Sequence, residues 1–264
     1  MQQRRRLANT DILISPLGLG TVKFGRNQGV HYPQAFSLPS DAELADLLAT
    51  AQSLGINFLD TAPAYGESET RLGSLLKNRR HEWVISTKVG ETFTAGQSYF
   101  DFSPTAIRQS IERSLQRLHT DYLDMVLIHS NGEDQRLIEG ERVFDTLAEL
   151  KQAGSIRAFG MSTKTVEGGR LAVEQSDVVM ITFNPVQQIE RAVIKHAQAL
   201  SKGVLIKKAL ASGHLNKIAE KNPVRHALEF IFQEPGVTSV VLGTINTEHL
   251  QRNVNHYVEF ASSQ

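Results

Sequence analysis

The chain has 264 residues, 41% of them hydrophobic, and its 28 Lys and Arg residues balance 28 Asp and Glu residues. This length suits one α/β barrel domain over residues 1–264, and the zero net charge gives no overall field for binding nucleic acid or a membrane surface. The absence of cysteine excludes disulfides, thiolate chemistry and cysteine-ligated metals.

Short apolar, β-branched runs alternate with segments of helical period along almost the whole chain. We expect strands near 17–22, 56–60, 83–88, 122–129, 156–161, 178–183, 203–207 and 238–242. We expect helices near 41–54, 67–77, 104–118, 139–152, 165–175, 190–201, 221–233 and 247–257. Eight such βα units predict an α/β fold with a closed parallel (β/α)8 barrel, the TIM barrel.

The alternative architecture is a doubly wound open sheet, which needs a glycine-rich turn leading directly into a helix after the first strand. The run Gly18-Leu19-Gly20-Thr21 is followed by no helical pattern within a few residues. Two connections are long, near 23–39 and 89–103, and both should lie on the C-terminal face, where barrel active sites are found. Aromatic residues in the second connection either hold that loop on the barrel rim or form a wall of the substrate pocket; they are Phe93, Tyr99, Phe100 and Phe102.

Four polar side chains stand at or just after the ends of three successive predicted strands: Asp60, Tyr65, Lys88 and His129. A tyrosine is a weak acid at neutral pH, but a nearby ammonium stabilises its phenolate, and a buried carboxylate keeps that ammonium charged. A histidine on the next strand would orient a carbonyl oxygen. Each residue alone has an ordinary structural explanation, as a turn cap, a strand end or a core residue. Their coincidence on neighbouring strands favours carbonyl reduction.

These residues lie in segments that resemble the aldo-keto reductase family over nearly the full chain. The segments are Leu17–Thr21, Gly55–Glu69, Ser86–Lys88, Ser114–Leu118, Tyr122–His129, Gly154–Ser162 and Val241–Thr244 with Asn253. The resemblance implies a catalytic tetrad of Asp60, Tyr65, Lys88 and His129, with Tyr65 as the proton donor. It also implies an oxidoreductase that reduces an aldehyde or ketone to an alcohol with NADPH, NAD being possible.

The same resemblance assigns cofactor contacts residue by residue. They are Gly20, Thr21, Val22 and Asp60 beside the nicotinamide ribose, Ser162 and Thr163 at the carboxamide, Leu210, Ser212 and Gly213 over the pyrophosphate, and Gly243, Thr244, His249, Arg252 and Asn253 at the adenosine end. Thr163 and Met180 replace the family's frequent Asn and Gln, and Lys207 stands near the position of a stacking aromatic. Lys207 and Lys208 either point to water or supply charge to the cofactor. Arg252 favours NADP, because a guanidinium engages phosphate bidentately.

Two other functions stay open at this point. One is a regulatory subunit that binds the cofactor as a sensor; the other is an aldolase-type barrel with Lys88 as a Schiff-base lysine, which Asp60 disfavours by keeping Lys88 protonated. The expected partner is a small-molecule carbonyl substrate, with no metal, and family precedent favours a monomer. The basic start of the chain lacks a signal-peptide core, and no apolar stretch approaches the ~18 residues of a membrane span, so we expect a cytoplasmic protein.

Overall fold

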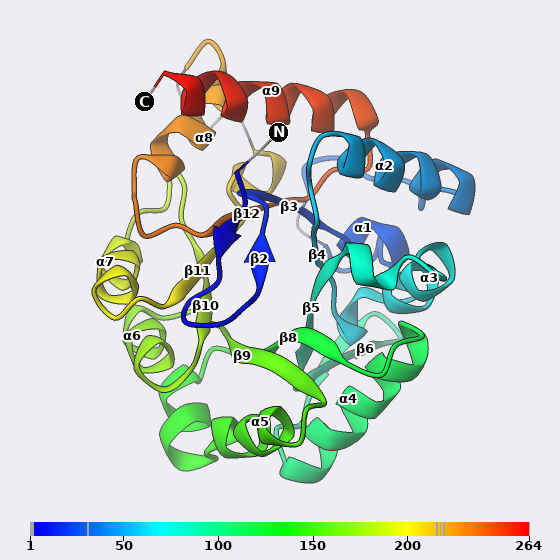
Figure 1. Cartoon of the computed structure of the whole chain (residues 1–264), viewed down its shortest axis with the longest axis vertical. Coiled ribbons are helices and arrows are strands. Elements are labelled where there is room, and N and C mark those ends of the chain that lie inside the picture. The colour runs from blue at the N-terminus through cyan, green and yellow to red at the C-terminus, as the bar shows by residue number, and fades with distance from the viewer. Residues whose placement is uncertain (1–2, 31, 215, 217, 219, 264) are drawn as a thin grey trace.

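The computed structural model describes residues 3–30, 32–214, 216, 218 and 220–263. A closed barrel of parallel strands forms the centre of the molecule (Figure 1). Its strands are β3 (Leu17–Gly20), β4 (Phe58–Asp60), β5 (Val84–Val89), β8 (Leu123–His129), β9 (Ile156–Ser162), β10 (Val178–Thr182), β11 (Gly203–Lys207) and β12 (Ser239–Leu242). Because β12 pairs with β3 and closes the ring, the predicted TIM barrel is confirmed and the open sheet is excluded.

Helices surround this barrel, as Figure 1 shows. They are α2 (Asp41–Ser53), α3 (Ser68–Leu75), α4 (Pro104–Arg117), α5 (Val143–Gln152), α6 (Val166–Gln175), α7 (Arg191–Ala199), α8 (Pro223–Phe232) and α9 (Thr247–Ser262). The predicted start of α2 is a capping box, in which the Ser40 side chain accepts from the Glu43 amide and the Glu43 carboxylate accepts from Ser40 N–H at 2.7 Å. None of the described helices combines the length and apolar character needed to cross a bilayer.

Several predicted boundaries were wrong; for example, α9 continues to Ser262, five residues beyond its predicted end at 257. A short helix, α1 (Val22–Gly25), follows the first barrel strand at once, although the sequence showed no helical pattern there. One turn is too short to produce a hydrophobic period. The helix expected from residue 139 begins at Val143, because Arg136–Gly140 forms a separate π-helical turn before it. Residue 31, within the long connection expected at 23–39, lies outside the described residues.

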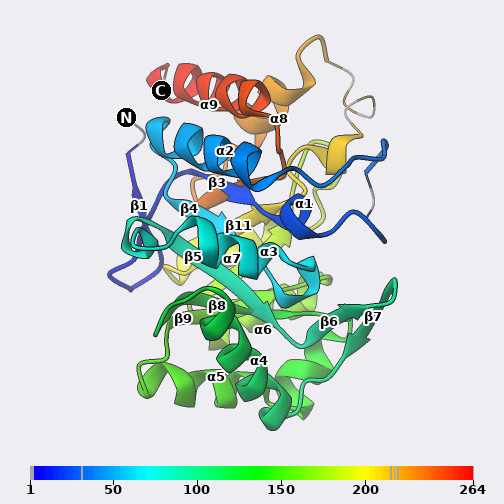
Figure 2. The same cartoon turned by 90° about the vertical axis from the view of Figure 1, so that its right-hand side faces the viewer.

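An N-terminal hairpin covers one end of the barrel. Its strands are β1 (Arg5–Arg6) and β2 (Leu13–Ile14). In Figure 2 they lie at the end opposite a second hairpin, formed by β6 (Glu91–Thr94) and β7 (Gln97–Phe100). Leu7, Ile12 and Ile14 are buried and pack with side chains of the barrel interior, among them Phe58 and Met125. The N-terminal mouth is therefore filled with apolar side chains, which leaves the C-terminal mouth for function.

The connection after β5 is a second hairpin, β6 (Glu91–Thr94) and β7 (Gln97–Phe100), rather than an irregular loop. Ala95 and Gly96 at its tip both have positive φ, +52° and +81°, as a tight two-residue hairpin turn requires. Phe102 is buried, and Phe100 stacks on it with ring centroids 6.0 Å apart. These contacts hold the hairpin to the rim. None of the four aromatics lines the cavity described next, which favours the rim interpretation over the pocket-wall interpretation.

Candidate active site

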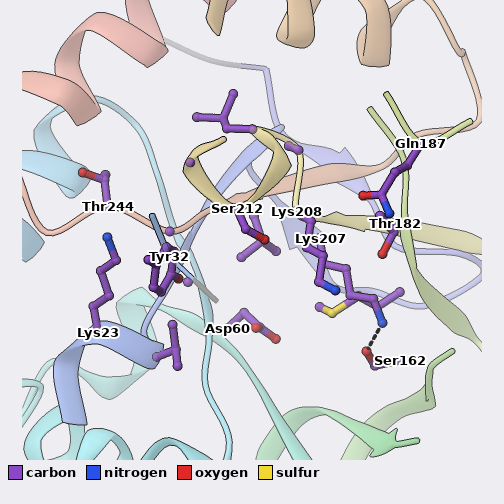
Figure 3. A pocket seen from close by; sticks show the side chains of 18 of the residues that line it. Lys23, Tyr32, Asp60, Ser162, Thr182, Gln187, Lys207, Lys208, Ser212 and Thr244 are labelled. Atoms are coloured by element: carbon purple, nitrogen blue, oxygen red, sulfur yellow. Dashed lines mark hydrogen bonds between the residues drawn. The ribbon is translucent and has the colours of Figure 1, made fainter. Parts of the chain in front are cut away.

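A cavity of about 990 Å³ lies at the C-terminal ends of the barrel strands. Its wall contains every residue that the sequence assigned to catalysis or cofactor binding, and Figure 3 shows part of it. They are Gly20, Thr21, Val22, Asp60, Tyr65, Lys88, His129, Ser162, Thr163, Leu210, Ser212, Gly213, Gly243, Thr244, His249, Arg252 and Asn253. The fold thus brings together residues that are up to 233 positions apart, from Gly20 to Asn253.

A buried ion pair joins the ends of β4 and β5. Lys88 Nζ lies 2.8 Å from both carboxylate oxygens of Asp60 and donates a third hydrogen bond to Thr61 O at 2.9 Å. Burial lowers the pKa of Lys88, but Asp60 and Tyr65 raise that pKa by more, so it lies above its usual value. Lys88 therefore carries a full positive charge at neutral pH. This geometry disfavours Lys88 as a Schiff-base nucleophile.

Tyr65 lies against this ion pair. It ends a 3₁₀ turn, Pro63–Tyr65, that follows β4, and Lys88 Nζ lies 4.8 Å from the centroid of its ring. Gly66 has φ +61°, and a Cβ there would lie only 2.2 Å from Gly25 O, so the turn needs glycine at this position. Burial raises the pKa of Tyr65 and the Lys88 charge only partly opposes this, so the phenol keeps its proton at neutral pH.

His129, at the end of β8, completes the group. Its ring meets the Tyr65 ring edge-on, with centroids 6.2 Å apart. On its other side, Nδ1 lies 2.6 Å from Glu91 Oε2. The carboxylate oxygen is not aligned with the Nδ1–H bond, so this close contact is not a well-formed hydrogen bond. Burial lowers the pKa of His129. Burial would raise the pKa of Glu91, but the contact with His129, a hydrogen bond from Ser98 and the Arg26 charge together lower this pKa to about 2.

Glu91 is a neighbour of the candidate site that the sequence analysis missed. It opens the β6–β7 hairpin and brings a carboxylate to the predicted catalytic histidine from outside the barrel. The signal that was available is the Ala95-Gly96 turn between two short alternating segments, which indicates a hairpin that folds back on the barrel.

Ser162 and Thr163 lie at the end of β9, where the nicotinamide end of a cofactor was predicted. Lys207 Nζ donates to Ser162 Oγ and to Thr163 O, both at 2.7 Å, and Figure 3 shows the first of these bonds. The Thr163 hydroxyl is buried and has no hydrogen-bond partner. Buried polar groups are normally paired, so this hydroxyl is available to a bound ligand. Both lysines line the cavity, but Lys207 is partly buried and hydrogen-bonded there, whereas Lys208 is exposed to solvent.

The loop after β11 has unusual backbone conformations next to the cavity. Lys208, Ala211 and Ser212 have φ of +54°, +48° and +55°, and Gly213 has +88°. For residues with a side chain this left-handed region costs roughly 1–2 kcal/mol each. Such strain is concentrated at functional sites more often than elsewhere. Gly213 N–H donates to Leu210 O at 2.8 Å, which holds the loop closed on itself.

The opposite end of the cavity lies at the start of α9. The Asn246 side chain caps this helix by accepting from His249 N–H at 2.8 Å. Arg252 is exposed and lines the cavity, and it has no ion-pair partner within the described part of the chain. Asn253, the next residue, is buried. The guanidinium is thus free to meet an anionic group at this end. Across the described residues, no cluster of His, Asp and Glu is arranged to hold a metal ion.

We expect Lys207→Met to stabilise the protein at neutral pH. Burial lowers the pKa of Lys207 to about 7. Between about pH 7 and 10.5 the unfolded chain holds a proton that the folded protein has released, so wild-type stability rises with pH in this window. Met cannot be charged, so the variant should be more stable than the wild type at pH 7, by roughly 2 kcal/mol once partial exposure and the two lost Lys207 hydrogen bonds are discounted. Urea unfolding at pH 7, 8.5 and 10 measures the difference, which should shrink as pH rises.

Lys208→Met is the matched control, because its exposed ammonium stays in water when the protein folds. It should change the pH dependence of stability much less than Lys207→Met does, because Lys208 acts on the Lys207 titration only through its charge. An equal effect of both substitutions would contradict the assignment of the titration to Lys207.

The sequence model of the Aldo/keto reductase family matches residues 16–225, about four-fifths of the chain. The chain belongs to the aldo/keto reductase family. A solved structure of a putative aldo-keto reductase from Pseudomonas aeruginosa is 49% identical, with a TM-score of 0.89 over 98% of this chain and 95% of that one. The uncharacterized oxidoreductase YqkF of Bacillus subtilis is 26% identical, covering 96% of this chain and 90% of its own. The NADH-specific methylglyoxal reductase of Escherichia coli is 34% identical over 58% of this chain and 50% of its own.

This aldo/keto reductase is therefore an oxidoreductase of carbonyl compounds, of a family that works with a nicotinamide cofactor. The motif segments that suggested the family from Leu17 to Ser162 fall inside the matched range. The last predicted segment, with Thr244 and Asn253, lies beyond it. The family model therefore does not cover the residues predicted to contact adenosine, and their assignment is supported by their place in the cavity wall.

Proposed function

We propose that the protein uses NADPH to reduce an aldehyde or ketone to an alcohol, with Tyr65 as the proton donor. One observation carries this proposal. The charged Lys88, held by both oxygens of Asp60, lies against the ring of a phenol that keeps its proton at neutral pH. A sensor that only bound the cofactor would not need this arrangement. When bound, the cofactor supplies the hydride.

Tyr65 gives its proton to the carbonyl oxygen as the alkoxide develops. The phenolate that remains is stabilised by the Lys88 ammonium, and Asp60 prevents Lys88 from losing its proton instead. The barrel holds Tyr65, Lys88 and Asp60 in place before the substrate binds, so little free energy is spent on reorienting these side chains during the reaction.

His129 acts mainly by position in this scheme. Because the Glu91 carboxylate approaches Nδ1, we assign the proton of the neutral ring to Nδ1, which leaves Nε2 as an acceptor. Only the imidazolium would donate from Nε2 to a carbonyl oxygen. Burial lowers the pKa of His129, so the imidazolium is a minor form at neutral pH. The proton therefore comes from Tyr65, and His129 shapes the wall beside the carbonyl.

The residues present fit a dinucleotide. The unpaired Thr163 hydroxyl and the Ser162 hydroxyl would hold a carboxamide, which both donates and accepts hydrogen bonds. Ser212 and Gly213 would contact the pyrophosphate, and Arg252 would contact a 2′-phosphate at the far end of the same cavity. Because one relative is named as NADH-specific, every assay should compare NADPH with NADH.

The direct test is the loss of nicotinamide absorbance when small aldehydes, methylglyoxal and ketones are added to the protein with NADPH or NADH. Turnover with at least one carbonyl compound supports the reductase. Tight cofactor binding without turnover across the panel would favour the regulatory subunit instead.

We expect Arg252→Ala to weaken NADPH binding by about tenfold, since a charged hydrogen bond to phosphate contributes roughly 1.5 kcal/mol or more. NADH binding should change by less than about twofold, because NADH lacks the 2′-phosphate. Fluorescence titration of both reduced cofactors gives the two dissociation constants. Arg225→Ala, an exposed arginine on α8 outside the cavity wall, is the control. Equal losses for NADPH and NADH would show that Arg252 does not contact the phosphate.

A further inference from the structure

The cavity contains a second lysine whose surroundings differ from those of Lys88. Lys88 is bound by a carboxylate, whereas both hydrogen bonds of Lys207 go to neutral acceptors, Ser162 Oγ and Thr163 O. Lys207 makes no ion pair with a carboxylate among the residues that the structure describes. Nothing in its immediate contacts therefore requires the ammonium form. The proposed reduction does not use this side chain.

Lys207 is also available as a nucleophile. Burial brings its pKa to about 7, so about half of the side chains are neutral amines near pH 7, against fewer than about one in a thousand for an ordinary lysine. A neutral amine that lines a pocket is the group that attacks carbonyl substrates in Schiff-base enzymes. A nucleophile must also be reachable by the substrate. Lys207 is the last residue of β11 and lines the cavity, and Figure 3 shows it beside Lys208 and Ser162.

A carboxyl group with an unused oxygen shares this cavity. Glu190 is 5% exposed, and its Oε2 accepts from the Thr182 amide at 3.0 Å, while Oε1 is buried without a partner. Burial raises the pKa of Glu190. Its charge acts on Lys207 more strongly than that of any other carboxylate described here. A buried carboxyl group that lines the same cavity as a neutral amine can donate and accept a proton near neutral pH, directly or through a water molecule.

We propose that Lys207 is a Schiff-base lysine that captures aldehydes reversibly, with Glu190 as its acid and base. The amine lone pair forms a bond to the aldehyde carbon, and one of the two N–H protons of the resulting ammonium moves to the carbonyl oxygen, with the Glu190 carboxyl group as relay, to give a carbinolamine. The carbinolamine hydroxyl then leaves as water with a proton from the Glu190 carboxyl, and the Glu190 carboxylate takes the remaining N–H proton. One aldehyde and one amine give one imine and one water, without any change of oxidation state.

This activity goes beyond carbonyl reduction and needs no nicotinamide. Small aldehydes are the expected ligands, because a ketone carbon is more crowded and Lys207 Nζ is held against Ser162 and Thr163 at the end of β9. The two reactions share a cavity but use different lysines, Lys88 and Lys207, so they can be separated by substitution.

The test uses propanal with cyanoborohydride at pH 7 on the cofactor-free protein, followed by peptide mass spectrometry. Cyanoborohydride reduces each imine to a stable secondary amine. We expect Lys207 to be alkylated at least about tenfold faster than Lys195, an exposed lysine on α7, because a much larger fraction of Lys207 is neutral. Repeating the mapping on Lys208→Met protein separates Lys207 from its neighbour in the same peptide.

Two variants examine the roles. Lys207→Met should lose the fast-labelled site, and Glu190→Gln should slow labelling of Lys207 by at least about tenfold while the Gln side chain can still accept from Thr182 N–H. Tyr65→Phe should be labelled at the wild-type rate, so a failed reductase assay and a failed capture assay are independent results. The proposal is overturned if Lys207 in the wild-type protein is labelled no faster than Lys195. Unchanged labelling of Glu190→Gln would remove Glu190 from the scheme.

Discussion

Tyr65→Phe is expected to lower kcat for carbonyl reduction by about two to four orders of magnitude, the usual contribution of a positioned general acid. The substitution removes one oxygen from a ring that remains packed beside Lys88 and His129. Without the phenol, the proton would have to come from water or from the minor imidazolium form of His129. Steady-state kinetics with NADPH and a saturating aldehyde measures the loss.

The dissociation constant of NADPH, measured by fluorescence titration, should stay within about twofold of the wild-type value, since the loss belongs to the transition state. Tyr99→Phe is the matched control, because this tyrosine is 55% exposed on β7 and lies outside the cavity wall. Retention of wild-type kcat by Tyr65→Phe would exclude Tyr65 as the proton donor.

The parts of this fold that the sequence predicted follow from one physical rule. A parallel strand buried on both faces needs a continuous apolar run, and such runs marked all of the barrel strands. Parallel strands of a barrel end at the same face, so Asp60, Lys88 and His129 had to lie near one another once the strands were identified.

The parts that the sequence did not predict depend on contacts between distant segments. The strands β1 and β2 have two residues each, too few to show a period, and they are stabilised by the barrel end that they cover. The contact of Glu91 with His129 joins the hairpin to β8 across 38 positions. The neutral form of Lys207 depends on burial by residues of other strands and loops, which composition and spacing do not contain.

The second large effect should come from the Asp60–Lys88 pair. Asp60→Asn leaves a buried ammonium without its carboxylate, and Lys88→Met leaves a buried carboxylate without its ammonium. Removing one partner of a buried ion pair typically costs about 3–5 kcal/mol, because the remaining charge stays away from water. Both side chains here are almost inaccessible to solvent, at 2% exposed for Lys88 and 5% for Asp60. Urea unfolding at pH 7 should therefore show a large loss of stability for each single variant.

The double variant, Asp60→Asn with Lys88→Met, separates charge pairing from packing. It buries no charge, so its loss of stability should be smaller than the sum of the two single losses by about 2 kcal/mol or more. Additive losses would contradict the view that the ion pair is a coupled unit. The folded double variant should still reduce carbonyl compounds poorly, since Tyr65 would have no ammonium to stabilise its phenolate. If the double variant is more stable than either single variant but its kcat stays low, a neutral pair of similar size can support the fold. The charged pair would then be needed for its effect on Tyr65.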